Sequence, residues 1–324
     1  MKKTIITLAI IIATMTLAQA QQISVVSPQG ATQIYTDLNL AIQGASAGST
    51  LYLSGRHFPL NDTTKIAKEL TIIGVGHRPD TKNADGPTIV SGNISFMNGA
   101  DNSILMGVHL TGNVNIANGD GAVNTILVRF CNVNSIQVGH ANCQNILINQ
   151  NYIRNYSNGG NSAITFSNNI LHSIRDVNGG VIDHNIVRHN YYNNGTMAFY
   201  GISNTQIKNN ILVDPGSYLN SGNNSAVSNN MLCNRTFGDN SVSVESWDDV
   251  FVGTYTGINV NDNYRLKGAQ GKNAGTDGTD IGIYGGSGFS DTGLPPGPRI
   301  TAKVVANQTD ASGNLSVEIK VEVE

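Results

Sequence analysis

The chain contains 324 residues, of which 40% are hydrophobic and only 13% are charged, and its formal net charge is −3. A chain of this length can bury one long core or about two ordinary domains. The slightly acidic balance argues against a nucleic-acid partner, because such partners are bound by a basic protein face. Asparagine fills many polar positions instead, at about one residue in eight, so the surface consists largely of amides and hydroxyls.

The first 20 residues have the pattern of a secretory signal peptide. Two lysines, an apolar run over residues 5–17 and the small-x-small tripeptide at residues 18–20 follow one another in the order typical of such leaders. We therefore expect cleavage near Ala20 and a protein that is secreted, periplasmic or held at the cell surface. The apolar run is too short for a comfortable membrane span, and no later apolar stretch is long enough either.

The next segment is expected to close one end of a stack of strands. Asp37 is a suitable N-cap for a short amphipathic helix, whose apolar face includes Leu38, Ala41 and Ile42. Such a helix can cover the open end of the stack, where unpaired strand edges invite aggregation. Two compact β runs, each closed by Gly, follow it at residues 50–54 and 70–76.

In the middle of the chain, one short phrase recurs in altered form. Its copies are NILINQNYIR, AITFSNNILH, GVIDHNIVRH, TQIKNNILVD and SAVSNNMLCN. Alignment of the copies places one Asn in a column, at Asn151, Asn169, Asn185, Asn210 and Asn230, with a looser sixth copy at Asn263. The intervals are 18, 16, 25, 20 and 33 residues. A fixed phrase with variable connections predicts a solenoid with loops of unequal length.

Apolar residues flank the Asn column on both sides. Three positions before it stand Ile148, Phe166, Ile182, Ile207, Val227 and Val260, and two positions after it stand Ile153, Leu171, Val187, Leu212 and Leu232. This pattern predicts two short strands that meet at a tight bend and share one core. At the bend, Asn tolerates left-handed backbone angles, and stacked carboxamides can bond one another. We therefore interpret the column as a structural Asn ladder.

The three cysteines are too few and too scattered for a disulfide framework or a zinc site. Cys131 falls in the Asn column and Cys233 lies three places after it, which favours small buried positions for both. A bridge between Cys131 and Cys143 remains an alternative.

The sequence also resembles a known superfamily at both ends of the repeat region. The stretches AIQGASAGSTLYLSGRHF and TKIAKELTIIGVGHRPD resemble the opening coils of secreted parallel β-helix proteins of the pectin-lyase-like superfamily, and GKNAGTDGTDIGIYGG resembles their closing coil. The resemblance implies an all-β, right-handed parallel β-helix, which is a single-stranded solenoid. We expect about ten coils and a rod of roughly 45–50 Å, with a groove suited to a linear polymer.

Beyond residue 286 the pattern changes. Residues 287–298 are rich in Gly and Pro and are predicted to form a linker, and residues 299–324 alternate apolar and polar side chains as a β-hairpin does. A lone hairpin is marginal in water, so we expect it to dock on the rod. The predicted organisation is therefore a leader (1–20), a β-helix (21–286), a linker (287–298) and a hairpin (299–324), in a monomer.

The superfamily includes lyases, hydrolases, epimerases and adhesins, so the resemblance does not specify an activity. Its lyases use a Lys or Arg base on uronic-acid polymers, often with Ca²⁺ held by acidic residues. The repeat places Asp183 and Lys208 on successive coils, so Lys208 or Arg188 is a candidate base beside Asp183. The alternative interpretation is a surface ion pair of little energetic consequence. Asp176 and the GTDGTD acids Asp277 and Asp280 are further candidates for Ca²⁺, but no tight carboxylate cluster is visible.

Other side chains are candidates for contact with a glycan. Arg154, His172 and Arg188 form a basic stripe three positions after the Asn column, and Tyr191 and Tyr192 lie in a loop inserted in the widest central interval. Asp214, a further candidate for Ca²⁺, is placed with them. We predict a secreted protein that binds polysaccharide or a cell-surface glycan along one lengthwise face; the alternative is a polysaccharide lyase that acts by β-elimination. No metal or other cofactor is assigned.

Overall fold

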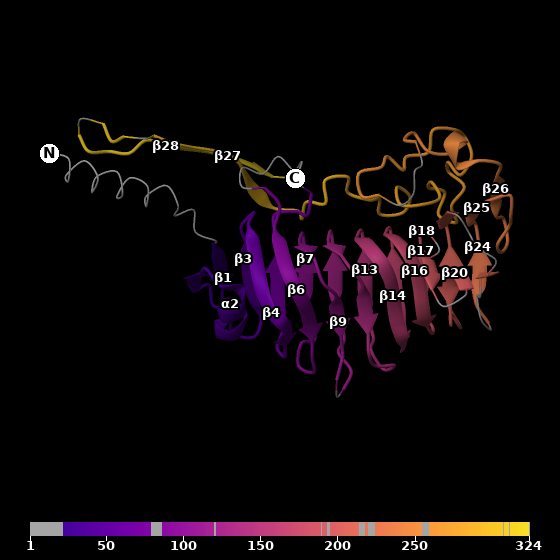
Figure 1. Ribbon diagram of the computed structural model, residues 1–324, viewed down its shortest axis with the longest axis horizontal. Coiled ribbons are helices and arrows are strands. Elements are labelled where there is room, and N and C mark those ends of the chain that lie inside the picture. The colour runs from indigo at the N-terminus through magenta and orange to yellow at the C-terminus, as the bar shows by residue number, and fades with distance from the viewer. Residues whose placement is uncertain are drawn as a thin grey trace.

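A computed structural model describes residues 22–78, 86–119, 121–188, 190–192, 195–213, 218–219, 224–254, 259–306, 308–310 and 312–323. The predicted leader, residues 1–20, lies outside them. The described chain forms a rod of stacked short strands, with an irregular C-terminal segment along one side and a hairpin at the N-terminal end (Figure 1). Nearly all of its regular structure is β, in two long sheets whose strands are mostly parallel.

The N-terminal end of the rod is built from antiparallel strands and one short helix. Strand β1 (Ile23–Val26) pairs antiparallel with both β2 (Thr32–Tyr35) and β3 (Ser49–Leu53). Helix α2 (Leu38–Gly44) begins after Asp37, whose side chain accepts a hydrogen bond from the main-chain N–H of Leu40. The helix packs against β1, β2 and β4 (His57–Ile66) at this end of the rod.

From β3 onward, one strand per coil joins an eleven-stranded sheet, sheet A. In spatial order it contains β2, β1, β3, β5 (Leu70–Ile73), β7 (Ile104–Met106), β10 (Leu127–Arg129), β13 (Ile146–Asn149), β15 (Ile164–Ser167), β17 (Val181–Asp183), β21 (Gln206–Lys208) and β24 (Ala226–Ser228). The pairs from β3 to β24 are parallel.

The fifteen-stranded sheet B forms the other wall. Its main path contains β11 (Asn132–Val133), β8 (His109–Leu110), β6 (Ile89–Phe96), β9 (Val114–Ile116), β12 (Ile136–Val138), β14 (Tyr152–Ser162), β16 (Ile170–Val177), β18 (Ile186–Arg188), β22 (Ile211–Val213), β25 (Met231–Cys233) and β26 (Val242–Val244). Outside that path lie β4, β19 (Asn190–Tyr192), β20 (Gly195–Tyr200) and β23 (Tyr218–Leu219). Strand β4 pairs with β6.

The predicted apolar columns are confirmed by the strand register. Ile148, Phe166, Ile182, Ile207 and Val227 pair in that order in sheet A. Ile153, Leu171, Val187, Leu212 and Leu232 do the same in sheet B. All except Val227 are fully buried in one continuous core between the sheets. The repeat therefore forms a solenoid-like stack because each coil contributes the same two apolar positions to that core.

The looser sixth copy of the repeat does not join the stack. Asn263 is exposed, and its side-chain oxygen accepts a hydrogen bond from the N–H of Arg265, two residues later. The assignment of Val260 and Asn263 to the columns is therefore wrong. The stack ends at β26, and residues 271–286, which resemble a closing coil, contain no strand.

Residues 271–297 instead fold back along the stack, and we call this segment the strap. The strap helps to bury a second apolar cluster on the outside of sheet B, which includes Ile170, Ile186 and Ile211. Later strands of sheet B add Val213, Met231 and Val244 to this cluster. The remaining members come from the strap and from the residues just before it: Trp247, Val250, Phe251, Tyr264, Leu266, Ile281, Ile283 and Phe289. The part of the strap that was predicted to be a linker thus packs on the rod.

The C-terminal hairpin consists of β27 (Pro298–Val305) and β28 (Val317–Val323), which pair antiparallel. Among the described residues they form a separate two-stranded sheet, and Val317, Ile319 and Val321 are about half exposed. The expected docking of this hairpin on the rod is therefore not observed. Figure 1 shows it extending past the N-terminal end.

Cys131, Cys143 and Cys233 are free thiols, so the alternative bridge between the first two is absent. Burial raises the pKa of the Cys131 thiol to about 12, against the effect of nearby main-chain hydrogen bonds.

Within the described ranges, no helix has the length and apolar character needed to cross a membrane.

Candidate functional site

The predicted Asn ladder runs along the corner between the two sheets. Asn151, Asn169, Asn185, Asn210 and Asn230 are all completely buried. The side-chain oxygen of each later Asn accepts bonds from both the N–H and the carboxamide of the Asn one coil earlier, at 2.9–3.1 Å. At the N-terminal end of the ladder, the N–H of Cys131 donates to Asn151 at 3.0 Å. We call these five asparagines the inner row.

The residue before each inner-row Asn has left-handed backbone angles. The φ angles of Gln150, Asn168, His184, Asn209 and Asn229 lie between +52° and +57°. Left-handed geometry was expected of the ladder Asn itself, but the tight bend requires it one position earlier. We call these five residues the outer row. The side chain of each one contacts the strap.

Contacts between the outer row and the strap follow one another in order along the rod. Asn229 donates to the carbonyl of Ala274 at 2.8 Å, and Asn209 donates to the hydroxyl of Thr276 at 3.0 Å. Further toward the N-terminal end, the Asn168 carboxamide donates to the carbonyls of Ile283 and Gly285, and Gln150 accepts from the N–H of Ser290. The strap therefore runs antiparallel to the direction in which the coils stack.

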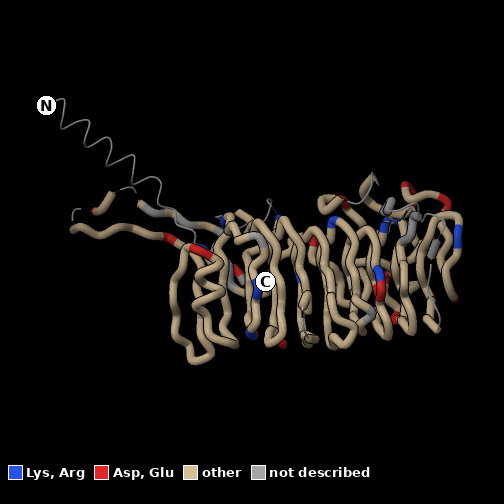
Figure 2. Tube along the Cα trace, turned by 60° about the horizontal axis from the view of Figure 1, so that its bottom comes forward, with Lys and Arg blue, Asp and Glu red and all other residues tan. Residues whose placement is uncertain are grey.

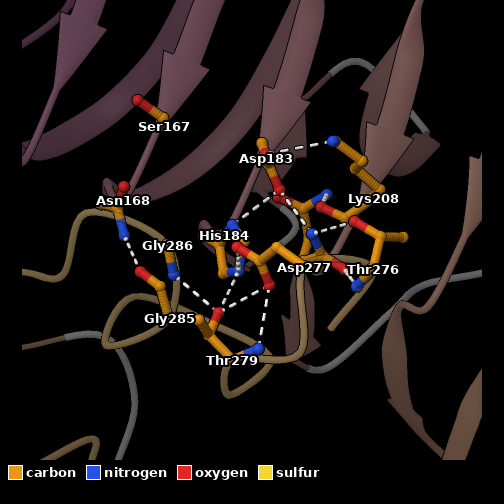
Figure 3. Close-up of polar contacts among 12 residues, drawn as sticks. Ser167, Asn168, Asp183, His184, Lys208, Thr276, Asp277, Thr279, Gly285 and Gly286 are labelled. Atoms are coloured by element: carbon orange, nitrogen blue, oxygen red, sulfur yellow. Dashed lines mark hydrogen bonds and ion pairs between the residues drawn. The ribbon is translucent and has the colours of Figure 1, made fainter. Parts of the chain in front are cut away.

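His184 stands at the centre of the most polar part of this contact (Figure 3). Its ring is almost fully buried, and Nδ1 lies 2.7 Å from Oδ1 of Asp183. On the opposite side, Nε2 lies 3.2 Å from the hydroxyl of Thr279 and 3.7 Å from a carboxylate oxygen of Asp277. The ring therefore bridges the stack and the strap.

Thr279 holds the strap side of this cluster. Its hydroxyl donates to Oδ1 of Asp277 at 2.7 Å and accepts from the N–H of Gly286 at 2.8 Å. Asp183, His184 and Thr279 follow one another as in a catalytic triad, but the Thr279 hydroxyl is directed to the Asp277 carboxylate. We call this cluster, which joins the stack to the strap, the clamp.

Partial burial acts to raise the pKa of Asp277, but its neighbours have the opposite and larger effect. The hydroxyl and N–H of Thr279 donate to its carboxylate, His184 lies nearby, and together they lower that pKa. The other acid of the turn, Asp280, accepts from the N–H of Asn273 at 3.1 Å. Both acids of the GTDGTD motif are thus used within the turn and in its contact with the stack.

Asp183 and Lys208 were predicted to lie on successive coils, and the register of β17 and β21 confirms this. Their charged atoms are 3.6 Å apart, and both side chains are partly exposed. The Asp183 carboxylate also accepts from the Asn209 carboxamide at 2.9 Å. Asp183 and Lys208 belong to a row of residues at the carboxyl ends of the sheet A strands. We call it the polar row, and it consists of Arg129, Asn149, Ser167, Asp183, Lys208 and Ser228.

A surface groove of about 560 Å³ lies at the amino ends of three neighbouring strands of sheet A, β13, β15 and β17. Its lining consists of Gln144, Asn145, Ile146, Leu147, Ala163, Ile164, Thr165, Gly179, Gly180 and Val181. A Cβ atom at Gly180 would come within 2.3 Å of the carbonyl oxygen of Ile164, so the close approach of these coils requires glycine there. Small residues thus shape the groove, and the amides of Gln144 and Asn145 are part of its lining.

The predicted basic stripe lies on sheet B, beside the second apolar cluster. Arg154, His172 and Arg188 each follow one of the paired residues Ile153, Leu171 and Val187. The Arg154 guanidinium donates to the carbonyls of Leu110 and Thr111, both at 2.9 Å. It therefore joins coils of the stack to one another, and Arg188 lies on the other sheet from Lys208.

The remaining predicted residues are in or beyond β19. Tyr191 and Tyr192 belong to this strand, which pairs antiparallel with β20 and interrupts the parallel pattern of sheet B. Asp214 lies outside the described residues. Their proposed roles in substrate binding stay predictions.

Near the N-terminal end of the rod, the C-terminal part of the strap packs closely against Gly107 and the His77 ring. A Cβ atom at Gly293 would come within 2.3 Å of Nε2 of His77, and one at Gly107 would come within 2.3 Å of Pro295. His77 is 3% exposed. Burial, followed by the neighbouring charges of Arg78 and His109, lowers the pKa of His77 to about 3.

In the part of the chain that the structure describes, His, Cys, Asp and Glu side chains form no group of three or more arranged to hold a metal ion. The candidates for Ca²⁺ among these residues, Asp176, Asp183, Asp277 and Asp280, are therefore not gathered into one site.

Sequence reasoning missed the outer row. The signal was present, because each inner-row Asn is preceded by Gln, Asn or His and is followed by two successive apolar residues, as in Asn169-Ile170-Leu171. Two successive apolar residues in a strand indicate that both faces of the sheet are covered. The repeat thus contained evidence for a covering segment outside sheet B.

Comparisons with known proteins give no family assignment. No model of a known protein family matches the chain, and no curated protein is similar to it at the level searched.

Proposed function

We propose that this chain is a secreted, right-handed parallel β-helix of about ten coils, similar to the pectin-lyase-like superfamily, and that it binds an extended polysaccharide. The binding surface in this proposal is the outer face of sheet A. The strap and the second apolar cluster occupy the corner and the adjoining part of sheet B. Sheet A therefore offers the more open lengthwise surface.

The groove across β13, β15 and β17 is the observation that carries this proposal. Its volume of about 560 Å³ lies within the range of about 300–1,000 Å³ that is common for ligand sites. Leu147 is 38% exposed and offers an apolar surface to a sugar ring, and Gln144 and Asn145 offer amides to its hydroxyls. The polar row lies along the opposite ends of the same strands.

The scarcity of charge favours an uncharged, hydroxyl-rich polymer. Figure 2 shows that basic and acidic positions are sparse along the rod. Two of the charged members of the polar row, Asp183 and Lys208, form an ion pair, and Asp183 is also bonded to His184 and Asn209. A polymer of uronic acids needs cations to neutralise its many carboxylates. The outer face of sheet A supplies cations at few positions.

The alternative function is that of a lyase that acts on uronate polymers by β-elimination. Its candidate catalytic residues are Lys208 or Arg188 as the base, with Asp183 beside it. The ion pair of Asp183 and Lys208 supports it to the extent that a candidate base lies beside an acid. We favour the binding function because the Asp183 carboxylate is held by the clamp that fixes the strap.

Affinity electrophoresis in gels that contain xylan, mixed-linkage β-glucan, polygalacturonate or alginate tests the proposal. We expect retardation by a neutral polymer and loss of that retardation in Ala163→Trp, because the indole fills the groove. Ser243→Trp, an exposed position on β26, serves as the matched control. Equal retardation of both variants, or none of the wild type in any gel, contradicts the proposal. Release of unsaturated uronate products, abolished by Lys208→Ala, would establish the alternative.

A further inference from the structure

The C-terminal hairpin and the N-terminal edge of sheet B are both incomplete β structures. On β28, Val317, Ile319 and Val321 are 53%, 51% and 55% exposed, and they alternate with Glu318, Lys320 and Glu322. A two-stranded hairpin is marginal in water, and a third strand or a packed face is needed for stability. Among the described residues, β27 and β28 pair only with each other.

Strand β4 supplies an open edge. Among the described residues it pairs only with β6, so alternate residues of Thr63–Ile66 direct their main-chain groups away from that partner. The Asn39 side chain of α2 satisfies this edge nearer the start of β4, through the carbonyl of Pro59 and the N–H of Asn61. No such bond from α2 reaches the main chain of Thr63–Ile66 within the described structure.

A groove of about 480 Å³ lies beside this edge. Helix α2 contributes Asn39, Ile42 and Gln43 to it, and the other wall consists of Asn61, Thr63, Thr64, Lys65, Ala67 and Lys68. A helix face beside an open strand edge is the geometry that receives an added β-strand. Two lysines and no carboxylate line the groove, so its charge favours an acidic strand.

We propose that β28 of one copy of this chain adds to the edge of β4 in a second copy, and that the exchange is reciprocal. Side chains of a strand alternate between its two faces. In this arrangement Val317, Ile319 and Val321 lie on the side of α2, where Ile42 is the buried apolar residue of the groove lining, while Glu318 lies on the side of exposed Lys65. The alternation of β28 thus places its apolar residues toward the helix and Glu318 toward a lysine of the groove.

The occupant is assigned to a second copy because of where the two features lie. Figure 1 shows α2 on one side of the N-terminal end and the hairpin running along the opposite side and beyond that end. Two rods that meet end to end can exchange hairpins with one two-fold axis, which gives identical contacts in both directions. The proposed assembly is a dimer, whereas the sequence led us to expect a monomer.

Analytical ultracentrifugation of the full mature chain tests the proposal through a charge exchange. We expect a dimer in the wild type and at least about tenfold weaker association in either Lys65→Glu or Glu318→Lys, because each variant places like charges together. Mixing the two variants creates a complementary pair at both contacts, so the mixture is expected to dimerise again. Lys272→Glu, an exposed strap position, is the matched control and should dimerise as the wild type does.

Three outcomes overturn the proposal. The first is a wild type that stays monomeric at the highest concentration reached, and the second is a dimer that neither variant weakens. The third is failure of the mixture to dimerise. If the double variant regains wild-type thermal stability while the mixture stays monomeric, the hairpin docks on its own β4 edge instead.

Discussion

The inner and outer rows are adjacent in sequence but hold different parts of the molecule together. Inner-row carboxamides are buried and bond each coil to the next. Outer-row side chains, one residue earlier, reach across the corner to the strap. The left-handed bend between a sheet A strand and the following Asn produces this division, because it turns one side chain outward and the next one inward.

The inner row contributes to global stability, and the outer row contributes to the local stability of the strap. Loss of an inner-row amide leaves several buried main-chain and side-chain groups without partners, so the whole stack is weakened. Loss of an outer-row side chain releases part of the strap and leaves the coils in register.

Asn185→Ala should lower the free energy of unfolding by about 3–5 kcal/mol. The Asn185 side chain accepts from Asn169 and donates to Asn210 and to the carbonyl of Phe166, and the site is fully buried. Urea denaturation measures the change. Asn263→Ala, in the copy of the repeat that lies outside the stack, is the control and should cost less than about 1 kcal/mol. Equal costs would mean that the buried ladder does not stabilise the stack.

Acid should weaken the packing of the strap against His77. The pKa of His77 falls from 6.5 to about 3 in the folded chain, through burial and then the charges of Arg78 and His109. Between these two pKa values, His77 is protonated in the unfolded chain but stays neutral in the folded chain. The free energy of unfolding therefore decreases as the pH falls from about 6.5 toward 3. Between pH 7 and pH 4 the loss from this group should be roughly 3 kcal/mol.

His77→Phe tests the assignment, because Phe keeps a ring against Gly293 but cannot titrate. Urea denaturation at pH 7 and pH 4 should show a smaller acid loss in this variant than in the wild type. His57→Gln, at an exposed position, is the control and should leave the acid loss unchanged. A variant as acid-sensitive as the wild type would assign the loss to other groups.

Asn168→Gly should release the middle of the strap at a cost of about 1–2 kcal/mol. Glycine keeps the left-handed backbone but removes the bonds to the carbonyls of Ile283 and Gly285. Hydrogen exchange should become faster in residues 281–287, while the amides of Asn169 and Asn185 keep their protection. Faster exchange in the ladder itself would show that the two rows are not independent.

Lys208→Met should change stability by less than about 1 kcal/mol, because the pair with Asp183 is partly exposed and 3.6 Å long. Thermal unfolding at low and high salt measures this small contribution. A loss of several kcal/mol would mean that Lys208 is part of the clamp around His184.

The predictable part of the fold and site is the part encoded by repetition. The buried Asn column, the two apolar columns and the adjacency of Asp183 and Lys208 follow from residues that recur at the same place in each phrase. Asn263 was misplaced because its phrase has similar letters but belongs to no coil. His184 was missed because its role depends on Asp277 and Thr279, which lie far along the chain and follow no repeat.

The sequence by itself determined that the chain stacks as coils, because a residue type that recurs in one position selects its own neighbours. It also determined which side chains enter the core, since apolar positions on both sides of a polar bend can be buried in only one arrangement. Only the tertiary structure decided where residues 271–297 lie, which face of the rod they cover and which face they leave open. The strap shares no repeat with the coils that it contacts. Its contacts therefore depend on the path of the chain in space, which the local pattern of residues does not specify.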